Sequence, residues 1–216
     1  MYEGQPIGAI LATNENIAKK AAMLVAVEYE EQDAVVTIDD AIKADSFFPV
    51  AGHLPFKCGK PEEAFSTSKH VIEGSFETPR QEHFYEETLS MLVVPVNENN
   101  EMKVYCPTPN AFMTQSGIAN LLGVPANRIT VIVKRIGCNY GGKAIRGLPY
   151  AFAVSLAAQI SGKPVRSVLT RTQDIQMTGQ RGEFRGKYKV GVTDGIVTGI
   201  EYMLYKNGGF NMEQER

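Results

Sequence analysis

The sequence predicts an α+β fold, and three observations support this class. Residues 129–133 are rich in β-branched side chains and precede a glycine-rich segment and the almost wholly apolar residues 149–160, which predicts a strand, a loop and a helix. Residues 70–78, 89–96 and 102–106 have the composition of further strands. Asp194-Gly195 separates two strand-like segments and is a strong hairpin signal.

The first 60 residues predict a small α+β unit and a linker. We expect strands at residues 5–11 and 25–29 on either side of a helix capped by Asn14, followed by a short helix at 38–43. Residues 48–60 contain two prolines and two glycines, the composition of a connecting loop. We therefore place a domain boundary between residues 1–56 and 57–216.

The rest of the chain alternates strands and helices. The expected elements, in order, are a helical turn at 61–65, strands at 70–78, 89–96 and 102–106 with a turn at 97–100, a helix between Asn110 and Gly123, a buried strand at 129–133, a helix at 149–160, a strand at 162–170, a turn or short helix at 171–177, and a hairpin of 184–192 with 196–205.

Composition excludes several classes of function. The chain has 216 residues, 44% of them hydrophobic, which is enough for a buried core, and its net charge of −2 without a basic cluster argues against nucleic-acid and membrane-surface partners. Cys58, Cys106 and Cys138 are widely spaced and odd in number, which predicts no disulfide framework and a reducing compartment. No run of about 20 apolar residues and no signal pattern is present, so we expect a cytoplasmic location and no membrane contact.

Two stretches carry the candidate chemistry. The glycine loop, residues 135–143, contains Gly137, Gly141 and Gly142, which permit positive φ and leave backbone N–H groups uncovered for an oxygen-rich ligand. A tight turn without a ligand is the alternative interpretation. The polar segment, residues 80–86, concentrates an amide, an imidazole and two aromatic rings between two predicted strands, where a side chain can leave the ladder and face a ligand.

Several ordered motifs resemble the molybdenum hydroxylases, the family of xanthine dehydrogenase and aldehyde oxidase. These motifs are residues 81–85, 122–129, 133–135, 137–143, 162–166, 171–174 and 187–191, so the resemblance covers almost the whole chain. It implies that residues 1–56 are the latter part of an α/β hammerhead-like domain and that 57–216 are the first part of a molybdopterin-binding domain. It also implies a molybdenum–molybdopterin cofactor, with iron–sulfur clusters and FAD carried by missing domains or other subunits.

The resemblance also implies the roles of individual residues. Gln81 is expected near the molybdenum as a donor to its oxo group, Tyr140 stands where the family usually has phenylalanine near the metal, and Gly141 and Gly142 complete the cofactor-facing backbone. Ala144 lies where xanthine dehydrogenases have a substrate-binding glutamate, which favours aldehydes or apolar heterocycles over hydroxypurines.

Other residues of the two stretches receive more ordinary interpretations. Cys138 and Asn139 replace glycines of the family pattern, and asparagine tolerates positive φ better than cysteine. We expect Cys138 to be a small packed side chain rather than a molybdenum ligand, and His83 to be packed and hydrogen-bonded. Lys143 and Arg146 are expected to be solvated surface charges, with contact to an acidic partner or to the pterin phosphate as the alternative. No catalytic residue can be named in this chain, because the family's glutamate base lies in a later domain.

Three interpretations of the function remain open. The chain is part of an enzyme that hydroxylates aldehydes or N-heterocycles with water as the oxygen source, and is inactive alone. Alternatively it is a non-enzymatic remnant or partner-binding fragment without molybdopterin, or a split subunit completed by another chain. The expected partners are a small-molecule substrate, the remaining domains and, for the full protein, a second copy in a homodimer. Both ends of the sequence resemble positions inside a longer protein.

Overall fold

The computed structural model describes residues 2, 4–49, 56–96 and 100–209. The chain divides into two compact units, each built from two stretches of sequence. Unit 1 comprises Met1–Glu30 and Glu82–Gln180, and unit 2 comprises Glu31–Gln81 and Arg181–Arg216. Helices and two sheets are both present, as the α+β prediction requires.

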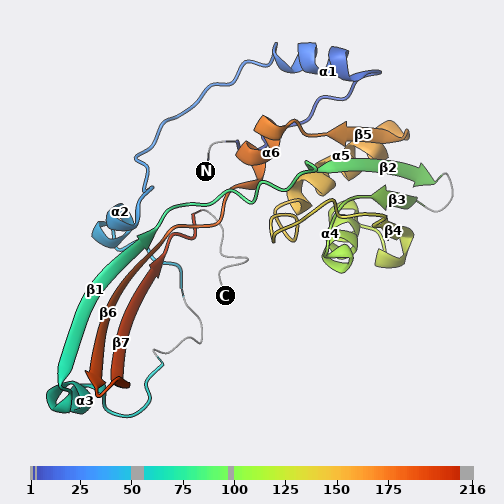
Figure 1. The fold of residues 1–216 in the computed structure, drawn as a ribbon. Helices are drawn as coiled ribbons and strands as arrows, with labels where there is room; N and C mark the ends of the chain where they lie inside the picture. Colours follow the sequence, from blue (N-terminus) through green and yellow to red (C-terminus); the bar gives the residue numbers. More distant parts are fainter. Residues whose placement is uncertain (1, 3, 50–55, 97–99, 210–216) are drawn as a thin grey trace. The chain divides into compact units, whose positions relative to one another are not determined.

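Unit 1 contains a four-stranded sheet with the order β4-β3-β2-β5 (Figure 1). The strands are β2 (Ser90–Val96), β3 (Glu101–Tyr105), β4 (Ile129–Ile132) and β5 (Val165–Val168), and only the β3–β4 pair is parallel. The helices are α1 (Glu15–Ala22), α4 (Ala111–Leu122), α5 (Leu148–Ser161) and α6 (Arg171–Thr178), with a 3₁₀ turn at Ala126–Arg128. Side chains of β2 and β3 such as Val93 and Val104 pack with Ile118 of α4 and Ala158 of α5, all with 0% exposure, to form the core.

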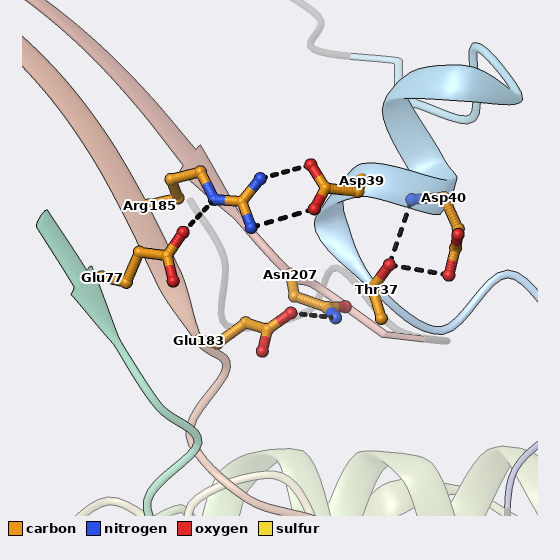
Figure 2. A network of polar contacts seen from close by, with 7 residues as sticks. All are labelled: Thr37, Asp39, Asp40, Glu77, Glu183, Arg185 and Asn207. Atoms are coloured by element: carbon orange, nitrogen blue, oxygen red, sulfur yellow. Dashed lines mark hydrogen bonds and ion pairs between the residues drawn. The ribbon is translucent and has the colours of Figure 1, made fainter. Parts of the chain in front are cut away.

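Unit 2 contains an antiparallel three-stranded sheet with the order β1-β6-β7. The strands are β1 (His70–Thr78), β6 (Phe184–Thr193) and β7 (Ile196–Lys206), and the helices are α2 (Ile38–Lys43) and α3 (Pro61–Thr67). Figure 2 shows how α2 is attached to the sheet: both terminal nitrogens of Arg185 bind the Asp39 carboxylate, and Arg185 Nε lies 2.7 Å from Glu77 of β1. Nearby, Asn207 donates to the Val36 carbonyl.

Local capping chemistry explains several helix boundaries. Asn14 accepts the N–H of Ile17 at the start of α1, and Asn110 accepts that of Met113 at the start of α4. Gly123 ends α4 in the left-handed conformation at φ 67°. The predicted elements from α2 to β7 are all present within a few residues of their expected bounds.

Three predictions about strands need correction. Residues 5–11 and 25–29 are not strands, because no segment among the described residues pairs with them and a strand requires a partner for its N–H and C=O groups. The predicted buried strand, β4, is an edge strand in which only Ile129 is fully buried.

Residues 50–55 of the predicted linker and 97–99 of the predicted turn lie outside the described residues.

No helix in the described part of the chain is both long enough and apolar enough to cross a membrane.

Candidate functional site

The glycine loop connects β4 to α5 and has an unusual backbone. Four of its residues have positive φ: Gly137 at 68°, Cys138 at 58°, Tyr140 at 47° and Gly141 at 88°. The Gly142 N–H donates to the Asn139 carbonyl at 2.8 Å, which closes a tight turn at residues 139–142, called here the crest of the loop. Left-handed backbone costs a non-glycine residue about 1–2 kcal/mol, so Cys138 and Tyr140 are held in place by their surroundings.

The left-handed conformation falls on Cys138 and not on Asn139. Asn139, whose φ is not positive, instead accepts the Lys143 N–H on its side-chain Oδ1 at 2.8 Å. Cys138 is exposed, so the expectation of a packed side chain is wrong for it. Residue preference favoured Asn139 for a left-handed backbone, and the structure places Cys138 in it instead.

Lys143 is buried, with 1% exposure, which contradicts the prediction of a solvated surface charge. Its Nζ donates to the carbonyls of Ile136 at 2.6 Å and Gly137 at 3.0 Å, and lies 4.6 Å from the centre of the Tyr85 ring. Burial lowers the pKa of this ammonium, while nearby carboxylates such as Glu87 partly oppose that shift. The two backbone carbonyls therefore take the place of the water molecules that were expected to solvate this ammonium group.

Tyr85 anchors the polar segment to α6. It is 1% exposed, and its hydroxyl donates to Asp174 Oδ1, while Asp174 Oδ2 accepts the Leu89 N–H at 2.6 Å. Burial, and then the Asp174 carboxylate, raise the pKa of Tyr85, so the phenol remains a donor at neutral pH. Arg171, three residues before Asp174, donates to the Glu86 carbonyl at 2.9 Å and lies over the Phe84 ring. The Arg-x-x-Asp corner therefore fixes this segment, a role that the sequence analysis did not assign.

The glycine loop and residues 83–87 pack directly against each other within unit 1. A Cβ placed on Gly142 would lie 2.7 Å from Tyr85 Cε1 and 2.9 Å from His83 Cγ, which is closer than side chains tolerate. A Cβ on Gly137 would lie 1.8 Å from Glu87 Oε2. Only glycine fits at both positions. The contact with Gly142 also agrees with the expectation that His83 is packed.

The crest of the loop carries an exposed polar cluster. Tyr140 is 62% exposed, and its hydroxyl lies 3.2 and 3.4 Å from the two Glu86 carboxylate oxygens. The Cys138 side chain hydrogen-bonds to the same carboxylate and is the largest cause of the lowered pKa of Glu86. Cys138 and then Glu86 raise the pKa of Tyr140 to about 12. Tyr140 is therefore a neutral donor at physiological pH.

The loop presents a cradle of backbone donors. Among the described residues, no backbone carbonyl accepts a hydrogen bond from the backbone N–H groups of residues 137–141, five in succession. A Cβ on Gly141 would meet no atom within 4 Å, so this glycine leaves the crest open on that side. Uncovered consecutive N–H groups at positive φ form concave sites for anions and oxygen-rich ligands. The loop therefore fits a ligand rich in phosphate or oxo oxygens.

The predicted site residues fall in both units. Tyr140, Gly141, Gly142 and the half-buried Ala144 belong to unit 1, and Gln81 belongs to unit 2. Gln81 forms a bridge with Arg181, their N–H and C=O groups joining at 3.2 and 2.9 Å.

The Gln81 side chain is also held by Arg181, which sequence reasoning missed. Arg181 Nη1 donates to Gln81 Oε1 at 3.0 Å. Because guanidinium can only donate, this contact assigns the amide oxygen and leaves the NH₂ group available as a donor. The signal in the sequence was weak, since Arg181 lies 100 residues from its partner.

Other kinds of ligand site are weaker candidates in the described residues. Within the described residues, no three or more His, Cys, Asp or Glu side chains group together to hold a metal ion. A cavity of about 250 Å³ in unit 2 is lined by Ile38, Glu77, Thr78, Pro79, Glu183, Phe184 and Arg185. Its arginine is already neutralised by Asp39 and Glu77, so the cradle in unit 1 is the stronger candidate for a ligand site.

Comparison with known proteins shows the family of this chain. Residues 47–216 match the family model of the molybdopterin cofactor-binding domain. The chain is 43% identical over 213 residues to a xanthine dehydrogenase from Blastobotrys adeninivorans and 41% identical over 214 residues to a xanthine dehydrogenase/oxidase from Mus musculus. These matches cover 98% and 99% of this chain but only 15% and 16% of the relatives, so the chain spans about a sixth of their length.

Solved structures share the fold at lower identity. Quinoline 2-oxidoreductase from Pseudomonas putida 86 has a TM-score of 0.78 at 24% identity, over 89% of this chain and 25% of that one. Aldehyde oxidoreductase from Desulfovibrio gigas has a TM-score of 0.78 at 22% identity, over 90% of this chain and 22% of that one. The two stretches that first suggested the resemblance therefore lie within a matching sequence and a matching fold, and the chain belongs to the molybdenum hydroxylase family.

Proposed function

We propose that this chain supplies one wall of the molybdopterin and substrate site of a xanthine dehydrogenase/aldehyde oxidase-type oxidoreductase. The observation that carries the proposal is the run of five backbone N–H groups at residues 137–141 that donate to no backbone carbonyl among the described residues. The bound cofactor would supply the redox chemistry that hydroxylates an aldehyde or N-heterocycle with oxygen from water. Iron–sulfur clusters and FAD, if used, belong to other domains or subunits.

The chain's own residues would bind and orient rather than transfer protons. The N–H groups of the glycine loop would donate to cofactor oxygens, and the closed packing of Gly142 on Tyr85 would hold that backbone rigid. The Gln81 NH₂ group, oriented by Arg181, would donate to an oxo group near the metal without a titrating proton of its own. Tyr140, neutral because its pKa is raised to about 12, would cover the crest with an aromatic ring.

Ala144 bears on the substrate. Its methyl group is half-buried at the end of the loop and offers no hydrogen bond to a purine. We therefore infer a preference for aldehydes or apolar heterocycles over hypoxanthine and xanthine, although the relatives described above are named for xanthine.

The finer domain assignment belongs to the same proposal. Residues 1–56 would be the latter part of a hammerhead-like domain and 57–216 the first part of the molybdopterin-binding domain. In the complete protein we expect the remaining domains and a second copy as partners, and a cytoplasmic location.

A second candidate function is a remnant that binds a partner but no cofactor. It is favoured by Cys138, a non-glycine residue in left-handed backbone within the cradle. Cys138 stands where the family pattern has glycine, and a loop no longer selected for cofactor approach would accept that replacement.

Isolation of the endogenous protein separates the two candidates. Its intact mass, its molybdenum content and its pterin content after oxidative release should be measured on one preparation. We expect a species much larger than this chain's 23.7 kDa, with molybdenum and pterin. A species of this chain's mass without either would refute cofactor binding and support the remnant.

A variant of the loop tests the cradle itself. Gly141→Val places a branched side chain at φ 88° on the open side of the crest, and should remove most of the molybdenum from the complete protein. Gly8→Val is the matched control, because a Cβ there meets nothing within 4 Å and its φ is not positive. Equal molybdenum content in both variants would contradict the role of the loop.

A further inference from the structure

Lys143 is a buried charge whose partners are not charges. Its exposure is 1%, yet no salt bridge among the described residues includes it, and its Nζ binds the carbonyls of Ile136 and Gly137. Glu87 and Asp174 act on the ammonium only as nearby charges. A buried ammonium is expensive unless its donors are satisfied, so the two carbonyl bonds account for its place in the structure.

These two bonds determine which way the loop's peptide groups face. No peptide bond in the described chain is cis. In a trans peptide the C=O and N–H point in opposite directions. Because the carbonyls of Ile136 and Gly137 face the ammonium, the N–H groups of the next residues, Gly137 and Cys138, point away from it. They are the first two donors of the cradle.

The Lys143 ammonium packs against the ring of Tyr85, which is held in place by hydrogen bonds. The Tyr85 ring lies 4.6 Å from Nζ, within the range of a cation–π contact. Tyr85 is itself fixed by its hydroxyl bond to Asp174, which the Leu89 N–H holds from the other side. The Lys143 side chain therefore lies between the loop carbonyls, which accept its hydrogen bonds, and the Tyr85 ring.

We propose that Lys143 is a positioning residue that turns the N–H groups of Gly137 and Cys138 toward the ligand by holding the preceding carbonyls inward. This inference rests on the proposed function for the identity of the ligand, but the peptide orientation can be measured without any ligand. An inward-held carbonyl also explains how Cys138 keeps a left-handed backbone at φ 58° without being a glycine.

The first test measures peptide orientation in the 216-residue chain. Residual dipolar couplings of backbone N–H groups should be compared for wild type, Lys143→Met and the exposed control Lys163→Met. Methionine keeps the length and apolar stem but removes all three donors. We expect changed couplings at Gly137 and Cys138 in Lys143→Met, with α4 and α5 unchanged, and no change in Lys163→Met. Wild-type couplings at both loop positions in a folded Lys143→Met chain would overturn the inference.

A second measurement needs no variant. In the wild-type chain, the Lys143 NH₃⁺ signal should show slow proton exchange and through-bond couplings to the carbonyl carbons of Ile136 and Gly137. Exchange as fast as that of Lys163, with neither coupling detectable, would also overturn the inference, even if Lys143→Met did not fold.

Molybdenum content of the complete protein adds the functional readout. We expect about tenfold weaker retention of molybdenum in Lys143→Met, equivalent to about 1.4 kcal/mol of lost preorganisation, and wild-type retention in Lys163→Met. Wild-type retention in Lys143→Met would overturn the ligand-facing role of Lys143. A wild-type protein without molybdenum would instead refute the proposed function, and the peptide orientation would then be judged from the couplings alone.

Discussion

Removal of the Tyr85 hydroxyl should destabilise unit 1 by about 2 kcal/mol. Tyr85→Phe keeps the ring, so the main loss is the hydrogen bond from the hydroxyl to a buried carboxylate. Bonds to charged groups contribute about 1.5–3 kcal/mol, and Asp174 Oδ1 would retain only a 3.4 Å contact with Thr178. Because the pKa of Tyr85 is raised, the hydroxyl is protonated at any pH used in such an assay, and the loss should not depend on pH near neutrality.

Urea unfolding, followed by the midpoint and slope, provides the measurement. Tyr29→Phe is the control, since Tyr29 is 78% exposed in the same unit. Asp174→Ala and the double variant complete a cycle whose coupling energy should be about 2 kcal/mol. A Tyr85→Phe chain within about 0.5 kcal/mol of wild type, or additive single variants, would refute the assignment of this bond as an anchor.

Two further variants test packing and charge. Gly142→Ala places a Cβ 2.7 Å from Tyr85, so we expect a loss of about 1–3 kcal/mol in urea unfolding, against almost none for Gly8→Ala; equal stability would show that the contact yields easily. In unit 2, Arg185→Gln should raise the lowered pKa of Asp39 toward 3.8, as followed by its side-chain carboxyl carbon shift in an NMR titration. A carboxylate whose pKa is lower in the folded state stabilises the fold at pH values above its unfolded pKa, and this stabilisation is lost as the pH falls through the folded pKa. The free energy of unfolding of the variant should therefore differ from that of wild type at neutral pH and approach it at low pH. An unchanged Asp39 pKa would contradict this ion pair.

The sequence predicted those parts of the fold whose causes are local. Asn110 and Gly123 mark both ends of α4 because a side-chain cap and a left-handed C-terminus act within a few residues. Asp194 and Gly195 likewise have φ 51° and 78° at the tip of the β6–β7 hairpin. Residues 5–11 and 25–29 have strand composition, but no strand in the described part of the chain pairs with them, and composition alone does not determine pairing.

The sequence indicated where to look for a candidate site but not which contacts hold that region together. The glycine loop and the polar segment stood out through residue type alone, and within unit 1 they do contact each other. The burial of Lys143 was not predictable, because its acceptors are backbone carbonyls, which every residue has. Arg181 acts on Gln81 through a pairing across 100 residues, which no local pattern records.

The interleaved connectivity of the two units has a consequence for biosynthesis. Strand β1 pairs with β6, but the larger stretch of unit 1, Glu82–Gln180, lies between them in the sequence. On a ribosome that adds about 5–20 residues per second, the roughly 100 intervening residues leave β1 without its partner for about 5–20 seconds. During that interval Ile72 and Phe76 have no neighbouring strand, and the nascent chain is open to chaperones and to misassembly. Synonymous codons that slow translation between β1 and β6 should therefore reduce the yield of folded protein more than the same codons placed after β7.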